Sequence, residues 1–240
     1  MASLGILVSD LAQALGVPDA TVSAYAKALR EAKLIRSSGR GTSAAPMQIE
    51  DGAVLLTAML ASPSIVEASV RTKQALRLPF MGSVAAPISR GESADAKRVV
   101  GSTITSPLDV HPPHVFENAI HMLLATALLN VPAEAGASPV ASNDYSDFWN
   151  SDSVQITFGF PLPVAIVDSR ISKTDVRRHV FGGRSKFEAN AKWPGFFDLL
   201  DWEAKLSGQE FTQARRVGAR AILATAASLL KPMKTTRERR

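Results

Sequence analysis

The stretch LAQALGVPDATVSAYAKALREAKLI, residues 11–35, limits the fold more than any other part of this chain. Its apolar residues recur at helical spacing on both sides of Gly16, a residue type that easily adopts the positive φ of a tight turn. A first helix is expected to begin near Ser9 and to end at Gly16. A second helix is expected to start after Pro18 and to run to about Lys33. The spacing therefore predicts two short helices that pack against each other across a turn.

One small residue and a set of apolar residues explain how these two helices would pack. Ala12 is small enough to let the helices cross closely at the steep angle of a helix-turn-helix. The inward-facing apolar set is Leu11, Leu15, Val17, Val22 and Tyr25. The polar side chains of the second helix are then left on its outer face.

A basic, glycine-rich segment follows the two helices. Leu34 and Ile35 are expected to form a short strand, SSGRGTS a tight turn, and AAPMQI a returning strand. With LAQALGV, ATVS and ALREAKLI, this segment makes residues 1–61 resemble the winged helix-turn-helix of bacterial transcriptional regulators, in the variant of the multiple-antibiotic-resistance-type and related families. The resemblance does not extend to residues 80–240.

The resemblance implies a transcriptional regulator of bacterial or phage type that binds specific sequences of double-stranded DNA. The helix at about 19–33 would enter the major groove, and a basic wing at 36–43 would lie beside it. The residues at matching positions are Asp19, Ala20, Thr21, Ser23, Ala24, Lys27, Arg30, Arg36 and Arg40. A homodimer is the expected form, because a second copy would supply a second half-site about one helical turn away.

Each of these residue types suits a particular contact with DNA. The Thr21 and Ser23 hydroxyls can bond phosphates or bases, and the alanine methyls can touch thymine methyls. The cations neutralise phosphates, although Arg40 at the tip of the wing could instead enter the minor groove. Asp19 departs from the pattern because it places a negative charge near the groove. Either the helix dipole favours it in the first turn, or it accepts a hydrogen bond from a cytosine.

Charge and composition fit a polyanionic partner in a reducing compartment. The formal net charge is +5 and the pI is about 9.7. Cysteine is absent, so disulfides and thiolate metal sites are excluded. The longest apolar run, residues 119–131, is shorter than the roughly 20 residues that a membrane helix needs. We therefore expect a cytoplasmic protein with no membrane partner and no cofactor.

The fold class predicted for the whole chain is α+β: an N-terminal winged helix-turn-helix and a C-terminal domain with a small antiparallel sheet. The division is 1–61 for DNA binding, 62–112 for a helical connector and irregular linker, 113–230 for dimerisation or a small-molecule or protein effector, and 231–240 for a disordered basic tail. Helices are expected over 51–61, 62–78 and 114–130, and strands over 98–104, 153–160, 164–171, 175–181 and 199–208. A capping box, Ser207 with Glu210, is expected to start a last long helix.

Two other functions remain open. One is a ring-forming DNA adaptor, similar to a phage small terminase or a partition protein. The other is a metal-dependent enzyme, because His114, Glu117 and His121 would share one stripe of a helix, although the same residues fit the polar edge of a core helix. No nucleophile motif or carboxylate pair indicates catalysis, and no enzyme activity is expected.

Three further features, a basic hairpin segment, a histidine and a group of aromatic residues, can be interpreted either as functional or as purely structural. The segment DVRRHVFGGRSK is either an anion-binding hairpin tip or a solvated loop. His179 within it is expected at the surface. The aromatic residues Tyr145, Phe148, Trp149 and Trp193 either line a ligand pocket or plug the core.

Overall fold

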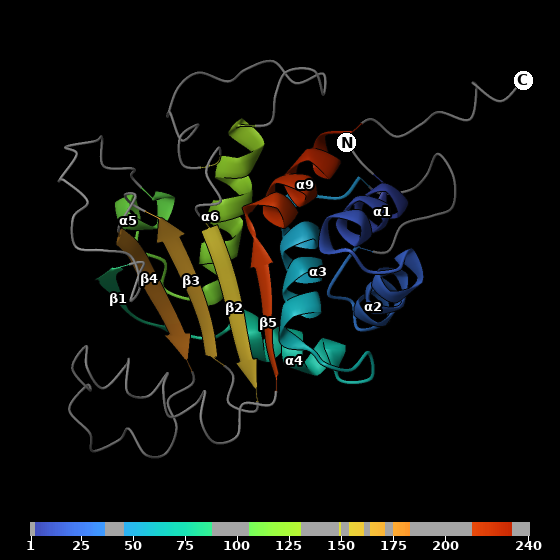
Figure 1. Cartoon of the computed structure of the whole chain (residues 1–240). Helices are drawn as coiled ribbons and strands as arrows, with labels where there is room; N and C mark the ends of the chain where they lie inside the picture. The colour runs from blue at the N-terminus through green and yellow to red at the C-terminus, as the bar shows by residue number, and fades with distance from the viewer. Residues whose placement is uncertain are drawn as a thin grey trace, which may run out of the picture.

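The computed structural model describes residues 3–36, 46–87, 106–130, 149, 154–160, 164–170, 175–182 and 213–231. In this part of the chain, helices are combined with one antiparallel five-stranded sheet (Figure 1). The α+β class expected from the sequence is confirmed at this level.

The sheet has the strand order β1-β4-β3-β2-β5, and every neighbouring pair is antiparallel. Its strands are β1 (Phe80–Pro87), β2 (Val154–Phe160), β3 (Val164–Arg170), β4 (Asp175–Gly182) and β5 (Gln213–Gly218). The three central strands follow one another along the chain, and the two edge strands come from distant segments. The sheet is therefore complete only when segments far apart in sequence meet.

One face of the sheet carries the core. Alternate residues of the central strands, such as Ile156, Val167 and Phe181, are fully buried there. The helices that lie over this face are α3 (Ile49–Ala61), α6 (Phe116–Leu129) and α9 (Ala219–Leu230) (Figure 1). Phe116 of α6 packs edge-on against Phe158 and Phe181, with ring centroids 6.3 and 5.4 Å away. These aromatic contacts fix α6 to the sheet.

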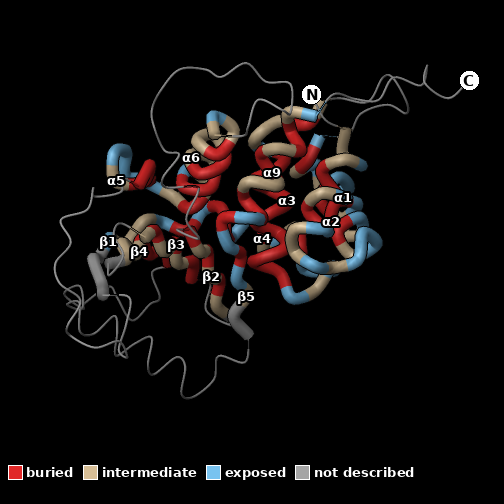
Figure 2. The backbone as a smooth tube through the Cα atoms, turned by 45° about the horizontal axis from the view of Figure 1, so that its top comes forward, coloured by how far each residue is buried: buried red, intermediate tan, exposed pale blue. Residues whose placement is uncertain are grey.

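Helix α3 lies at the centre of the molecule. All its residues from Asp51 to Ala61 are buried (Figure 2), because α2, α4, α6, α9 and two strands pack around it. A Cβ atom on Gly52 would lie 3.2 Å from Thr225 Cγ2 of α9. The missing side chain thus lets α3 and α9 approach closely.

The remaining helices lie outside this layer: α1 (Leu4–Leu15), α2 (Asp19–Glu31), α4 (Ala68–Leu76) and the short α5 (Pro107–Val110). Helix α1 packs on α9 from the other end of the chain (Figure 1). Lys231 Nζ donates to Asp10 Oδ2 at 2.7 Å across this contact. None of the described helices combines the length and apolar character needed to cross a bilayer.

Several predicted helix boundaries are wrong. Helix α1 begins at Leu4 rather than near Ser9, because the apolar residues before Ser9 continue the buried stripe with Leu7 and Val8. Residues 62–67 are not α-helical, and α4 begins only at Ala68.

Two strands were also missed. The predicted linker at 79–112 contains β1 and α5, and residues 213–218, predicted to be part of the last helix, form β5, so that this helix, α9, begins only at Ala219. Both strands form by pairing with distant partners, β4 and β2, which local periodicity does not reveal. The predicted strands at 98–104 and 199–208, the pair Ser207 and Glu210, and residues 232–240 of the tail lie outside the described residues.

Candidate nucleic-acid interface

The turn between α1 and α2 is built as the sequence predicts. Gly16 has φ 67° and ψ 30°, the left-handed conformation that glycine adopts without strain. Val17 N donates to Ala12 O at 3.0 Å and closes the end of α1. Ala12 itself is fully buried. A tight turn of this kind brings the start of α2 back against the end of α1.

The inner face of α2 is fixed by buried residues. Leu11, Val22 and Tyr25 are buried as predicted, whereas Leu15 and Val17 are only half-buried. The Tyr25 hydroxyl donates to Ser62 O at 2.8 Å, at the C-terminal end of α3. Helix α2 is therefore held by an apolar contact on one side and by a buried hydrogen bond at its middle.

The outer face of α2 is open to solvent (Figure 2). Ala20, Ser23, Lys27 and Arg30 are exposed and recur at helical spacing, so they share one face. Asp19 is also exposed and lies in the first turn, where the helix dipole favours a negative charge. Of the residues predicted to face DNA, these five are brought together.

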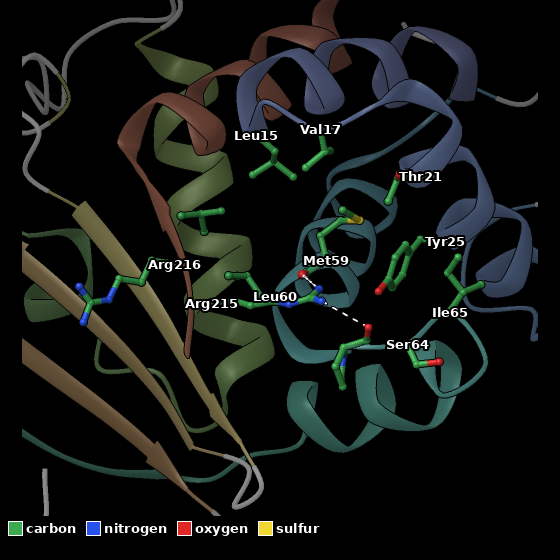
Figure 3. A pocket seen from close by; sticks show the side chains of 12 residues that line it. Leu15, Val17, Thr21, Tyr25, Met59, Leu60, Ser64, Ile65, Arg215 and Arg216 are labelled. Carbon is green, nitrogen blue, oxygen red and sulfur yellow. Dashed lines mark hydrogen bonds between the residues drawn. The ribbon is translucent and has the colours of Figure 1, made fainter. Parts of the chain in front are cut away.

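Thr21 and Ala24 are placed differently. Both are half-buried, and Thr21 lines a cavity beneath α2 rather than the open face (Figure 3). The difference arises because Thr21 lies one helical turn before Tyr25, whose side chain points inward. Thr21 is thus poorly placed for the DNA contact that the sequence predicts for it.

The two cations on the open face are accessible. Lys27 Nζ lies 3.9 Å from Glu31 Oε1, but both side chains are more than two-thirds exposed, so this pair is weak. Among the described residues, Arg30 has no ion-pair partner. Both side chains can reach an external anion at little cost.

Arg36, in contrast, is tied to the start of α3. Its backbone N donates to Asp51 Oδ1 at 3.0 Å, and its guanidinium pairs with Asp51 and Glu50 and donates to Gln48 Oε1. Asp51 is 3% exposed and also accepts from Gln48 N at 2.9 Å. The charge of Arg36 is therefore largely compensated within the molecule.

The predicted wing can be described only at its base. Leu34 and Ile35 are not in a strand. Lys33 turns the chain with φ 57°, and Leu34 N then donates a hydrogen bond of 2.9 Å to Leu29 O at the end of α2. Residues 46–48 are also not in a strand. Arg40 and the rest of 37–45 lie outside the described residues.

A cavity of about 610 Å³ separates α2 from the sheet (Figure 3). Its walls come from the α1–α2 turn, the C-terminal half of α3, residues 63–65 and strand β5. This cavity was not predicted from the sequence, because residues 213–218, which form β5 and one of its walls, were expected to be helical.

The histidine stripe predicted for a metal does not form. His114 lies before α6, which begins at Phe116, so it does not share a helical face with Glu117 and His121. Within the described ranges, no group of three or more potential ligands could hold a metal ion. Trp149, from the predicted aromatic group, is buried in the core, and Tyr145, Phe148 and Trp193 lie outside the described residues.

A charged cluster that the sequence did not predict lies at the far end of the sheet. His179 Nε2 and Arg177 Nη1 each lie 3.3 Å from Asp109 Oδ1 of α5. His179 is buried, so its predicted surface position is wrong. It lies two residues before Phe181 on β4, and both side chains therefore point to the face that the helices cover. Burial raises the pKa of Asp109, but the His179 hydrogen bond and the Arg177 charge outweigh it and lower that pKa below 3.8.

Comparison of the chain with protein-family models, with curated proteins and with solved structures finds no match.

Proposed function

We propose that this protein binds specific sequences of double-stranded DNA and regulates transcription, with α2 as the recognition helix of a winged helix-turn-helix. The observation that carries the proposal is the open face of α2. Its inner face is fixed by Val22 and Tyr25, while Ser23, Lys27 and Arg30 stay exposed. A helix held in this way can enter the major groove without rearrangement of the core.

The chemistry of the open face fits a division of labour between positioning and base reading. Lys27 and Arg30 would contact phosphates, which fix the register of the helix on DNA. Ser23 and the methyl group of Ala20 would face base edges near the start of the helix. Arg36 would hold the base of the wing through Asp51 instead of contacting DNA. The wing beyond it, including Arg40, belongs to the proposal on the strength of its sequence.

The test is DNA capture from random or genomic fragments, followed by affinity measurements at several salt concentrations. The variant Ser23→Ala/Lys27→Ala/Arg30→Ala removes the hydroxyl group and the two charges from the open face of α2. A matched control, Ser69→Ala/Lys73→Ala/Arg77→Ala, removes the same residue types from α4 and the residue that follows it. We expect the first variant to lose the enriched sites and to reduce the salt slope by about 2, and the control to bind as the wild type does.

The proposal fails if the wild type enriches no site over the α2 variant, or if the α4 control loses binding to the same degree. Sedimentation of the protein, alone and with captured DNA, tests the proposed homodimer. A dimer supports the regulator, whereas a larger ring would support the adaptor function that the sequence left open.

A further inference from the structure

The cavity beneath α2 has an apolar wall, and two arginines of β5, Arg215 and Arg216, border it. The apolar wall consists of Leu15, Val17, Met59, Leu60 and Val217. Arg215, from β5, points toward the end of α3, whereas the neighbouring Arg216 points away on the other side of the strand (Figure 3). A volume of about 610 Å³ falls in the range of small-molecule sites.

The guanidinium of Arg215 is fixed by backbone oxygens rather than by a carboxylate. Its Nη1 donates to Met59 O at 2.8 Å and to Ser62 O at 2.7 Å. Its Nη2 lies 3.4 Å from Pro63 O, a long contact. In the part of the chain that the structure describes, no acidic side chain pairs with Arg215. Among the described residues, its positive charge is thus offset by carbonyl dipoles at the end of a helix.

These contacts leave one edge of the guanidinium available. Both hydrogens of Nη1 are used, whereas Nε and one hydrogen of Nη2 have no partner among the described residues. That edge is the one that binds a carboxylate with two parallel hydrogen bonds. The protein shows this arrangement elsewhere, because Arg178 Nε and Nη2 donate to Asp168 Oδ1 and Oδ2 at 2.7 and 3.1 Å.

We propose that the cavity binds a small organic acid, whose carboxylate pairs with Arg215 and whose apolar body packs on the wall. An apolar body without a charge would leave the free edge of the guanidinium unpaired in a partly buried site. An inorganic anion would leave the apolar wall uncovered. The combination of the two features favours a molecule that carries both.

The site also gives a route from the ligand to the recognition helix, a step that rests on the proposed DNA-binding function. Ser62 O accepts hydrogen bonds from both Arg215 Nη1 and Tyr25 OH. Thr21 and Tyr25 of α2 line the same cavity. A ligand that pairs with the Arg215 guanidinium and packs beneath Thr21 changes the position of α2. The affinities for ligand and for DNA are therefore coupled.

The experiment measures binding of phenylacetate, naphthoate and decanoate, and of their neutral amides, to the full chain by calorimetry. We expect at least one acid to bind about tenfold or more tightly than its amide. Arg215→Gln should remove this preference, and Arg216→Gln, which removes an equal charge from a side chain that points away from the cavity (Figure 3), should keep it. Ile65→Trp fills the mouth of the cavity from a residue that is 41% exposed, so it should block binding without disturbing the core.

The inference is overturned if no acid binds better than its amide, or if Arg216→Gln loses as much affinity as Arg215→Gln. If Arg215→Gln does not fold, Ile65→Trp decides: undiminished binding of the acid would place it elsewhere. The effect on DNA is read separately, as the change in DNA affinity at saturating acid. Acid binding without DNA binding would refute the proposed function alone, and DNA binding without acid binding would refute this site alone.

Discussion

Replacing Gly16 with Ala should destabilise the protein, and replacing Lys33 with Gly should stabilise it. Both residues end a helix in the left-handed region, with φ 67° and 57°. The same type of hydrogen bond closes both turns: Val17 N donates to Ala12 O, and Leu34 N donates to Leu29 O. The two substitutions therefore test the same quantity, the free-energy cost of the left-handed conformation for a residue with a Cβ atom. One substitution introduces this cost and the other removes it.

The magnitude follows from the backbone alone. A Cβ atom on Gly16 would meet nothing within 4 Å, so no clash contributes. The left-handed conformation costs a residue with a Cβ about 1–2 kcal/mol, and the lower entropy of the unfolded Ala chain returns about 0.4–1 kcal/mol. We expect a net loss of about 0.5–1 kcal/mol for Gly16→Ala. Lys33 is exposed, so Lys33→Gly should gain a similar amount.

Urea unfolding measures both effects. With a slope of about 2–3 kcal/mol per molar urea, each midpoint should move by about 0.2–0.5 M, in opposite directions. The double variant should return close to the wild-type midpoint. A lower midpoint for Lys33→Gly, with an unchanged slope, would refute the reasoning, because it would show that the left-handed turn costs lysine nothing.

Two further predictions concern charged groups. Asp51→Ala should lower the free energy of unfolding by about 2–3 kcal/mol, because the buried carboxylate accepts hydrogen bonds from Arg36 N and Gln48 N that would lose their partner; an unchanged urea midpoint would contradict this. The pKa of Asp109 is lowered in the folded state, so its contribution to stability is complete above 3.8 and is lost as the pH falls below that value. The melting temperature of the wild type should therefore fall more between about pH 5 and pH 3 than that of Asp109→Asn, and equal falls would refute the role of the cluster.

The candidate interface was largely predictable because its determinants are local. The turn at Gly16, the small contact residue Ala12 and the bounds of α2 depend on residues within one or two helical turns. The exposed face of α2 follows from the same periodicity. The inward placement of Thr21 was missed although its spacing from Tyr25 indicates it, whereas the cavity that α3 and β5 form beneath it could not be predicted from local sequence.

Elements with short-range signals could be predicted from the residues alone: the α1–α2 hairpin, helix α6, and the consecutive strands β2, β3 and β4. The pairing of β1 and β5, the burial of His179 and the contact of Arg215 with the end of α3 depend instead on segments that meet only in the folded chain. The segments of β1 and β5 have no alternating apolar pattern, so they become strands because β4 and β2 satisfy their backbone hydrogen bonds. A cavity or a buried charge likewise exists only where segments far apart in the chain are brought into contact.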